Sequence, residues 1–293
     1  NVHKVNFNGG DLYYFPRDFT NFTGRMEEFP AFLERICEEK RIDTIMLFGD
    51  WHLVFVFLAL AAFGNFMWIT FRLPETQHPE DVVELTPKAV LHSAKTVLTN
   101  RVALFYTLGT TFIMACIFGF VNSAQQVYVE IYGLGTLFPV AFAGIGIVMA
   151  ASSLINSRIV GKIGMRRLSH GAMIGFTVTN GLWLVIDLIY AGAMPFWLFY
   201  GLFMLAWFQF GWIGPNFNAL AMEPLGHVAG AASSILGFAS TAFSALLGAA
   251  IGYAYNGTTT PMIAGFFVFA AIALCFTLIA EKGKLFQPHN PEI

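Results

Sequence analysis

The stretch IDTIMLFGDWHLVFVFLALAAFGNFMWITFRLPE, Ile42 to Glu75, decides how the chain is interpreted. Its first nine residues have the pattern of a buried β-strand in an α/β enzyme. Residues 53–71 form an apolar run long enough for a helix to cross a bilayer, which takes about 20 residues. Because no linker separates the two patterns, the stretch predicts a membrane protein joined at about residue 50 to a segment of a different fold.

The composition indicates that most of the chain lies in a membrane. Hydrophobic residues make up 56% of the 293 residues and charged residues only 12%, with a mean hydropathy of +0.63. An ordinary soluble domain carries roughly 25% charged residues. The net charge of -2 also gives no basic surface for a nucleic acid. We therefore expect an integral membrane protein, with the lipid bilayer as one of its partners.

The charged residues are unevenly distributed along the chain. Residues 1–50 hold six of the sixteen Lys and Arg residues and nine of the eighteen Asp and Glu residues, so this part has the character of soluble protein. The three cysteines, Cys37, Cys116 and Cys275, lie far apart and show no metal-ligand or CxxC spacing. The sequence therefore predicts neither a metal nor a cofactor.

Seven segments are apolar enough and long enough to span a bilayer. Their short connections alternate in charge: the connection after the third span contains four Lys or Arg residues, and those near 125–136, 191–194 and 256–259 contain none. Because cytoplasmic loops keep the positive residues, the C-terminus is expected in the cytoplasm and residues 1–50 outside. The segments are Leu53–Phe71, Val102–Ser123, Leu137–Ile159, Leu168–Tyr190, Pro195–Ala219, Val228–Tyr255 and Met262–Ala280.

The sixth predicted span carries small residues every four positions, at Ser240, Ser244, Gly248 and Gly252. Small residues at this spacing let helix backbones approach closely. The pattern predicts tight packing against another helix. A path for substrate between the helices is the alternative.

Residues 1–50 have a different periodicity. A β-prone run over residues 3–15 is broken by NGGD, apolar residues at helical spacing follow in residues 24–41, and residues 42–50 have a second strand pattern. This order predicts the βαβ start of an α/β fold. Such a segment is too short to fold alone.

The stretch INSRIVGKIGMRRLSH, Ile155 to His170, combines glycines and basic residues between two predicted spans. This combination suits a cytoplasmic gate, in which basic residues form hydrogen bonds with helix-end carbonyls and pair with acidic residues in one gating state. The alternative is that the basic residues merely anchor the loop on the cytoplasmic side of the membrane. Glu223, in the next cytoplasmic turn, is either a partner for this loop or a solvated carboxylate. The candidate gating residues are Arg158, Gly161, Lys162, Gly164, Arg166, Arg167 and Glu223.

Several motifs resemble those of bicyclomycin-resistance type drug efflux transporters of the major facilitator superfamily: LPETQHPE, SRIVGKIGMRR, GPNFNALAMEPLGHVAGAASSILGF and YNGTTTPM. The resemblance covers about residues 51–288, which correspond to the sixth span and the C-terminal half of such a transporter. It implies a mainly α, polytopic bundle in a bacterial inner membrane that exports hydrophobic small molecules, driven by the proton gradient. It also implies that an N-terminal half is missing and that the chain alone is inactive.

Polar residues inside a membrane are costly, so they are the natural candidates for the substrate pathway. Gln209 lies mid-span near Trp207, Phe208 and Trp212, which suits a pocket for amphipathic drugs. Core or lipid-facing aromatic residues are the alternative. Asp187 is the only acidic residue inside a predicted span. Its place near the outer end fits either a gate or proton site or a solvated interfacial carboxylate.

Residues 1–50 resemble another family. KVNFNGGDLYYF, FTGRMEEFPAFLERI and IDTIMLFGD are similar to the start of capsule polysaccharide synthesis proteins that transfer Kdo sugars onto a lipid anchor. This resemblance implies that Asn8, Gly9, Gly10 and Asp11 are the remnant of a sugar or nucleotide turn; a plain βα turn is the alternative. The segment is too short to be catalytic.

The chain is therefore divided into three parts. Residues 1–50 are a truncated βαβ segment, residues 51–100 a span and a cytoplasmic loop, and residues 101–293 a six-helix transporter half with its tail. The predicted function is transmembrane transport rather than catalysis. The alternative is a fragment of a Kdo-transferase-like enzyme, the whole chain joining pieces of two genes.

Overall fold

The computed structural model describes residues 3–7, 10–14, 51–73 and 86–287, and the chain divides into two compact units, residues 1–77 and 78–293. Within the first unit, the strands β1 (His3–Phe7) and β2 (Gly10–Tyr14) form an antiparallel hairpin. The same unit contains the helix α2 (Trp51–Arg72). Its 22 residues suffice to cross a bilayer.

The hairpin lies within the first β-prone run of the predicted βαβ start. Phe7 pairs with Gly10, so the two residues Asn8 and Gly9 connect the strands. Asn-Gly between two β-prone runs favours a two-residue hairpin turn, and the pairing is therefore local and antiparallel. Gly10 and Asp11 belong to β2 rather than to a βα turn. Asn8, Gly9 and the predicted helix and second strand at 24–50 lie outside the described residues.

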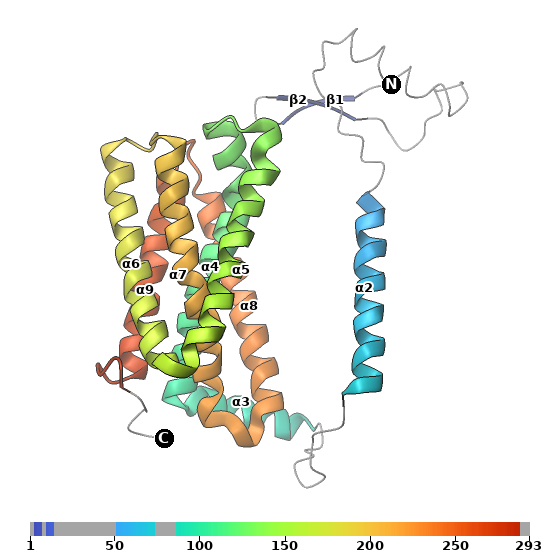
Figure 1. Ribbon diagram of the computed structural model, residues 1–293, viewed down its shortest axis with the longest axis vertical. Helices are drawn as coiled ribbons and strands as arrows, with labels where there is room; N and C mark the ends of the chain where they lie inside the picture. The colour runs from blue at the N-terminus through green and yellow to red at the C-terminus, as the bar shows by residue number, and fades with distance from the viewer. Residues whose placement is uncertain (1–2, 8–9, 15–50, 74–85, 288–293) are drawn as a thin grey trace, which may run out of the picture. The chain divides into compact units, whose positions relative to one another are not determined.

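The second unit is a bundle of long helices that run in alternating directions (Figure 1). Short helical turns extend or join them: η3 (Gln126–Ile131), η4 (Gly135–Leu137) and η5 (Glu223–Val228). The α-helices are α3 (Pro87–Thr99), α4 (Arg101–Gln125), α5 (Phe138–Ile163), α6 (Met165–Ile189), α7 (Phe196–Met222), α8 (Ala229–Tyr253) and α9 (Thr260–Ala280).

The described residues contain seven helices that are long and apolar enough to cross a membrane, α2 and α4 to α9, which confirms the predicted spans. The bundle also exposes apolar side chains. On α6, Val178, Leu182, Val185 and Ile189 recur every three or four residues and are 54–75% exposed. An apolar stripe on the outside of a bundle is the surface expected against lipid chains.

The segment between the first two spans is not only a loop. Residues 87–99 form α3, which packs against α4 and α8 and lies across one end of the bundle in Figure 1. Val97 is buried, whereas Leu91 and Leu98 are more than half exposed. This amphipathic helix was not predicted, because the segment was interpreted only as a basic cytoplasmic loop.

Small residues bring α4 and α8 together. A Cβ atom on Gly248 would lie 2.7 Å from the backbone nitrogen of Gly119 on α4, which leaves no room for a side chain. The Ser244 hydroxyl donates to the Thr111 carbonyl of α4 over 2.8 Å. The predicted small-residue stripe therefore packs one helix against another.

Candidate substrate pocket and helix-end networks

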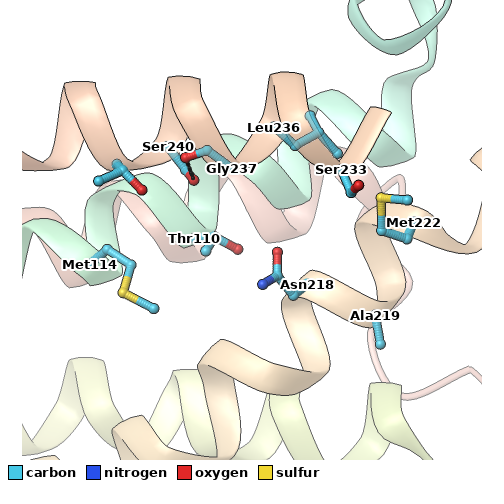
Figure 2. Close-up of a pocket in the computed structure, with 10 residues that line it drawn as sticks. Thr110, Met114, Asn218, Ala219, Met222, Ser233, Leu236, Gly237 and Ser240 are labelled. Atoms are coloured by element: carbon cyan, nitrogen blue, oxygen red, sulfur yellow. Dashed lines mark hydrogen bonds between the residues drawn. The ribbon is translucent and has the colours of Figure 1, made fainter. Parts of the chain in front are cut away.

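A pocket of about 460 Å³ lies between α4, α7 and α8 (Figure 2). Apolar and polar side chains share its walls. They include Thr110 and Met114 from α4, Asn218 and Met222 from α7, and Leu236 and Ser240 from α8. The volume lies within the range of small-molecule sites, roughly 300–1,000 Å³.

Asn218 is the pocket residue with the most free hydrogen-bonding capacity. Its side chain is exposed and has no hydrogen bond to any other described residue. The Thr110 hydroxyl instead donates to the Tyr106 carbonyl over 2.9 Å, and the Ser240 hydroxyl to the Gly237 carbonyl over 3.2 Å. Figure 2 shows the Asn218 amide directed toward Thr110 and α8. One amide among apolar groups suits an amphipathic ligand.

The predicted substrate-pathway residues of α7 do not line this pocket. The Gln209 amide donates to the Thr179 hydroxyl of α6 over 2.9 Å. The Trp212 indole donates to the Ser152 carbonyl of α5 over 3.0 Å, and Phe208 packs on its ring. These side chains therefore join α7 to α6 and α5 rather than meet a common cavity.

Trp207 lies in the aromatic core of the bundle. It is 1% exposed, and its ring centroid lies 4.2 Å from that of Phe203 and 5.2 Å from that of Phe266 on α9. The alternative interpretation of this residue, a core aromatic side chain, is the one the structure shows. Periodicity alone did not show that Trp207 faces the core, because α7 is apolar on nearly every face.

Arg166 is the centre of a buried network at one end of the bundle. We call this end, formed by the α5–α6 turn, η5 and residues 281–287, the basic end. The Arg166 guanidinium, 4% exposed, pairs with Glu223 over 2.5 Å and with Glu281 over 3.0 Å. Of the two interpretations of Glu223, a partner for the basic loop or a solvated carboxylate, the structure shows the first, with Arg166 as the partner. Glu281 was missed, although it directly follows the last span on the same side.

The same network includes a tyrosine, a histidine and the chain after α9. The Tyr106 hydroxyl donates to Glu281 over 2.6 Å and lies 2.8 Å from His170 Nε2. The Phe286 backbone N–H donates to His170 Nδ1 over 3.1 Å. Since Nδ1 accepts this bond, Nε2 carries the imidazole hydrogen and donates to Tyr106. The network thus connects α4, α6, α7, α9 and the segment after α9.

The other predicted gating residues surround this network without entering it. Gly164 has a φ of 91° between α5 and α6, a left-handed conformation that favours glycine, so the predicted tight turn is present. Arg158, Gly161, Lys162 and Arg167 are exposed or partly exposed. Arg167 donates to the Phe286 carbonyl over 3.3 Å. Their exposure agrees with positive-inside anchoring, whereas Arg166 has an additional structural role.

Asp187 occupies the opposite end of the bundle, which we call the Asp187 end. The side chain is 0% exposed, so the solvated interfacial alternative is wrong. The hydroxyl groups of Thr259 and Thr260, at the start of α9, lie 2.5 Å from Oδ1 and Oδ2 respectively. The Thr259 hydroxyl also lies 3.1 Å from the Gly192 carbonyl. Both threonines belong to the YNGTTTPM motif, but the motif did not indicate their partner.

Tyr132, which follows η3, is the titratable neighbour of Asp187. Burial raises the pKa of its hydroxyl far above the ordinary value, and a negative charge on Asp187 raises it further. Its hydroxyl is buried and has no hydrogen-bond partner in the described structure. The phenol therefore stays protonated. Among the described residues, no group of three or more His, Cys, Asp or Glu side chains is placed to hold a metal ion.

Residues 44–249 match the Major Facilitator Superfamily, so the chain belongs to this family of membrane transporters and is not an enzyme. The match contains the pocket, the α5–α6 turn and Asp187. The match also includes residues 44–50, which were predicted to belong to the enzyme-like segment. The resemblance of the N-terminal segment to Kdo transferases stays a prediction.

The chain is also similar to two curated proteins. The chain is 26% identical to the bicyclomycin resistance protein homolog of Haemophilus influenzae over 227 residues, which cover 75% of this chain and 54% of that protein. It is 29% identical to the uncharacterized MFS-type transporter YdgK of Bacillus subtilis over 233 residues, 78% and 56% of the two chains. The chain thus spans about half the length of the curated relatives that it matches. No solved structure gives a significant match.

Proposed function

We propose that this chain supplies one half of a proton-driven exporter of hydrophobic small molecules. The pocket between α4, α7 and α8 carries the proposal. It lies in the region that matches the family, and it combines a free amide on Asn218 with the apolar side chains of Met114, Met222 and Leu236. One relative is named for bicyclomycin resistance, which supports an antibiotic-like substrate.

The other half of the transport path comes from a complementary set of helices, in the same polypeptide or in another. Alternating access in transporters built from repeats places the substrate site between two halves near the bilayer midplane. The relatives are about twice as long as the stretch they share with this chain, which supports a second half. We therefore expect helices 101–280 to need such a partner for transport.

In this proposal, the network around Arg166 holds the cytoplasmic ends of the helices together in one conformation of the transporter. It ties α6, α7 and α9 in the arrangement described, and movement of the η5 turn that carries Glu223 breaks one of its ion pairs. The proposal places the protein in a bacterial inner membrane with the basic end and the C-terminus in the cytoplasm, because the basic residues gather there. A Kdo-transferase activity is not proposed, since nothing in the described residues favours it.

Co-expression tests the proposal. The chain is expressed in a drug-sensitive bacterium lacking its own efflux pumps, either alone or with the half of the Haemophilus influenzae relative that it does not match. We expect dye efflux and drug resistance only with the complementary half, loss of both in N218L, and retention in M222L, which keeps an apolar pocket wall. Efflux by the chain alone, or efflux that N218L leaves unchanged, would contradict the proposal.

A further inference from the structure

The segment that follows α9 is turned back toward α6 by the way the helix ends. The Gly283 N–H donates to the Leu278 carbonyl over 2.8 Å, and the Lys282 N–H donates to the Ile279 carbonyl over 3.3 Å. Lys282 has a φ of 50°. These two bonds around a left-handed residue form a Schellman motif, which ends a helix in a defined turn. The direction of residues 283–287, which we call the C-terminal strap, is therefore set by α9 itself.

Phe286 attaches the C-terminal strap to α6 by three contacts. Its N–H donates to His170 Nδ1 over 3.1 Å, and its carbonyl accepts from Arg167 over 3.3 Å. Its ring meets the His170 ring edge to face, with the centroids 5.9 Å apart. Phe286 has a φ of 67°, which is uncommon for a bulky residue. A residue keeps such a conformation only where its surroundings hold it, so the contacts with α6 fix this part of the strap.

His170 connects the strap to the buried network at the basic end. The His170 side chain is 0% exposed, and its Nε2 lies 2.8 Å from the Tyr106 hydroxyl. That hydroxyl donates to Glu281 Oε1 over 2.6 Å, and Arg166 Nε donates to the same oxygen over 3.0 Å. Because one carboxylate oxygen accepts both bonds, a shift of Arg166 changes the bond from Tyr106 and with it the partner of His170.

The other side of Arg166 leads to the pocket. Its guanidinium pairs with Glu223, the first residue of η5, and η5 joins α7 to α8. Met222, directly before Glu223, lines the pocket, and so does Ser233 near the start of α8. The Glu223 side chain is 28% exposed, whereas that of Arg166 is 4% exposed. A displacement of η5 therefore moves two walls of the pocket and separates Glu223 from a guanidinium that stays buried.

We propose that the C-terminal strap regulates the pocket, because docking of Phe286 on α6 and the position of η5 are coupled through the network around Arg166. With the strap docked, Arg166 is held between Glu281 and Glu223, and η5 is fixed. When η5 moves, the bonds that position His170 and the neighbouring Arg167 weaken, and the strap is released. The effect on export rests on the proposed function, whereas the coupling does not. Such coupling acts in both directions with the same free energy.

Hydrogen exchange, measured by mass spectrometry on the full chain in lipid vesicles, tests the coupling from the side of the strap. F286A removes the ring from His170 and keeps the disfavoured backbone conformation, so it should release the strap. We expect the amides of residues 225–228 on η5 to exchange about fivefold faster or more, the lower end of typical coupling between sites. Q287A, which changes the neighbouring exposed side chain, is the control and should leave them unchanged.

The amides of residues 190–193, which are hydrogen-bonded at the Asp187 end, report general loosening of the bundle. They should exchange at the same rate in F286A as in the unsubstituted chain. Unchanged exchange on η5 in F286A, or an equal increase at residues 190–193, would overturn the proposal.

The same experiment is made from the side of η5. E223Q removes the ion pair with Arg166 without touching the strap, and the Phe286 amide should then exchange about fivefold faster or more. E130Q, which changes an exposed carboxylate on η3, is the control. A Phe286 amide that E223Q leaves unchanged would also overturn the proposal. Neither measurement needs transport, so absent efflux in the co-expression assay would defeat the proposed function alone.

Discussion

Glu281 at the basic end and Asp187 at the opposite end are both fully buried carboxyl groups, but they have different partners. Glu281 contacts a guanidinium, that of Arg166, and accepts from the Tyr106 hydroxyl. Among the described residues, Asp187 accepts hydrogen bonds from two threonine hydroxyls and forms no ion pair. Substitution of the carboxyl group therefore breaks an ion pair at the basic end and changes hydrogen bonds alone at the opposite end.

The difference shows that the helices of one bundle are joined by an ion-pair network at one end and by hydrogen bonds at the other. At the basic end, Arg166 of α6 pairs with Glu223 of η5 and with Glu281, which follows α9, so removing the guanidinium takes the shared cation from two carboxyl groups. At the Asp187 end, α6 is joined to the start of α9 by hydrogen bonds from two threonine hydroxyls, and an amide at position 187 can also form hydrogen bonds with them. The variants below separate these two cases.

Replacing Arg166 should have the largest effect. R166Q removes the guanidinium that pairs with both Glu281 and Glu223, and breaking a buried pair in this way costs about 3–5 kcal/mol of unfolding free energy. The neighbouring variant R167Q is the control, since Arg167 is exposed and donates one bond to the Phe286 carbonyl. Thermal unfolding in detergent measures both. Equal losses in the two variants would mean that the network around Arg166 is not stabilising.

Replacing Glu281 should have a smaller effect. In E281Q, Arg166 keeps its ion pair with Glu223, and the amide oxygen can still accept from Tyr106. We expect a loss of about 2 kcal/mol, that of a hydrogen bond to a charged group. The same unfolding experiment checks it. A loss as large as that of R166Q would show that Glu281, rather than Arg166, holds the network together.

At the opposite end, removal of the Thr259 hydroxyl should cost about 1 kcal/mol, the net value of one hydrogen bond. T259V keeps the side-chain shape, and T258V is its matched control, because the Thr258 hydroxyl donates locally to Asn256. A loss in T258V as large as that in T259V would show that the contact with Asp187 adds nothing to stability.

The sequence was sufficient to predict the membrane spans and which of them have small residues for packing. Hydropathy reports segment length directly, and the spacing of Ser244 and Gly248 reports a close helix contact. The break at NGGD in the first β-prone run was predicted, but not that the residues on its two sides pair as a hairpin. An Asn-Gly pair between two β-prone runs favours such local antiparallel pairing.

The candidate site was harder to predict than the fold. A contact between Glu223 and the basic loop was one of two interpretations, because both lie on the same side of the membrane, and the structure shows it at Arg166. The pocket was placed at Gln209 and Trp207, whereas it lies beside Asn218, further along the same helix. Because α7 is apolar all round, its sequence does not show which face meets α4 and α8. Only the packing of the helices decides that.

The most direct test of the two-carboxyl comparison is the difference in thermal unfolding between D187N and E281Q, measured in the same detergent at neutral pH. In D187N the amide oxygen can accept from one threonine hydroxyl and the amide nitrogen can donate to the other, so this variant should lie within about 0.5 kcal/mol of the unsubstituted chain, as expected for a substitution that keeps its hydrogen bonds. E281Q breaks the ion pair with Arg166 and should lose clearly more. A loss in D187N equal to or greater than that in E281Q would contradict the view that an ion pair holds the basic end and hydrogen bonds hold the opposite end.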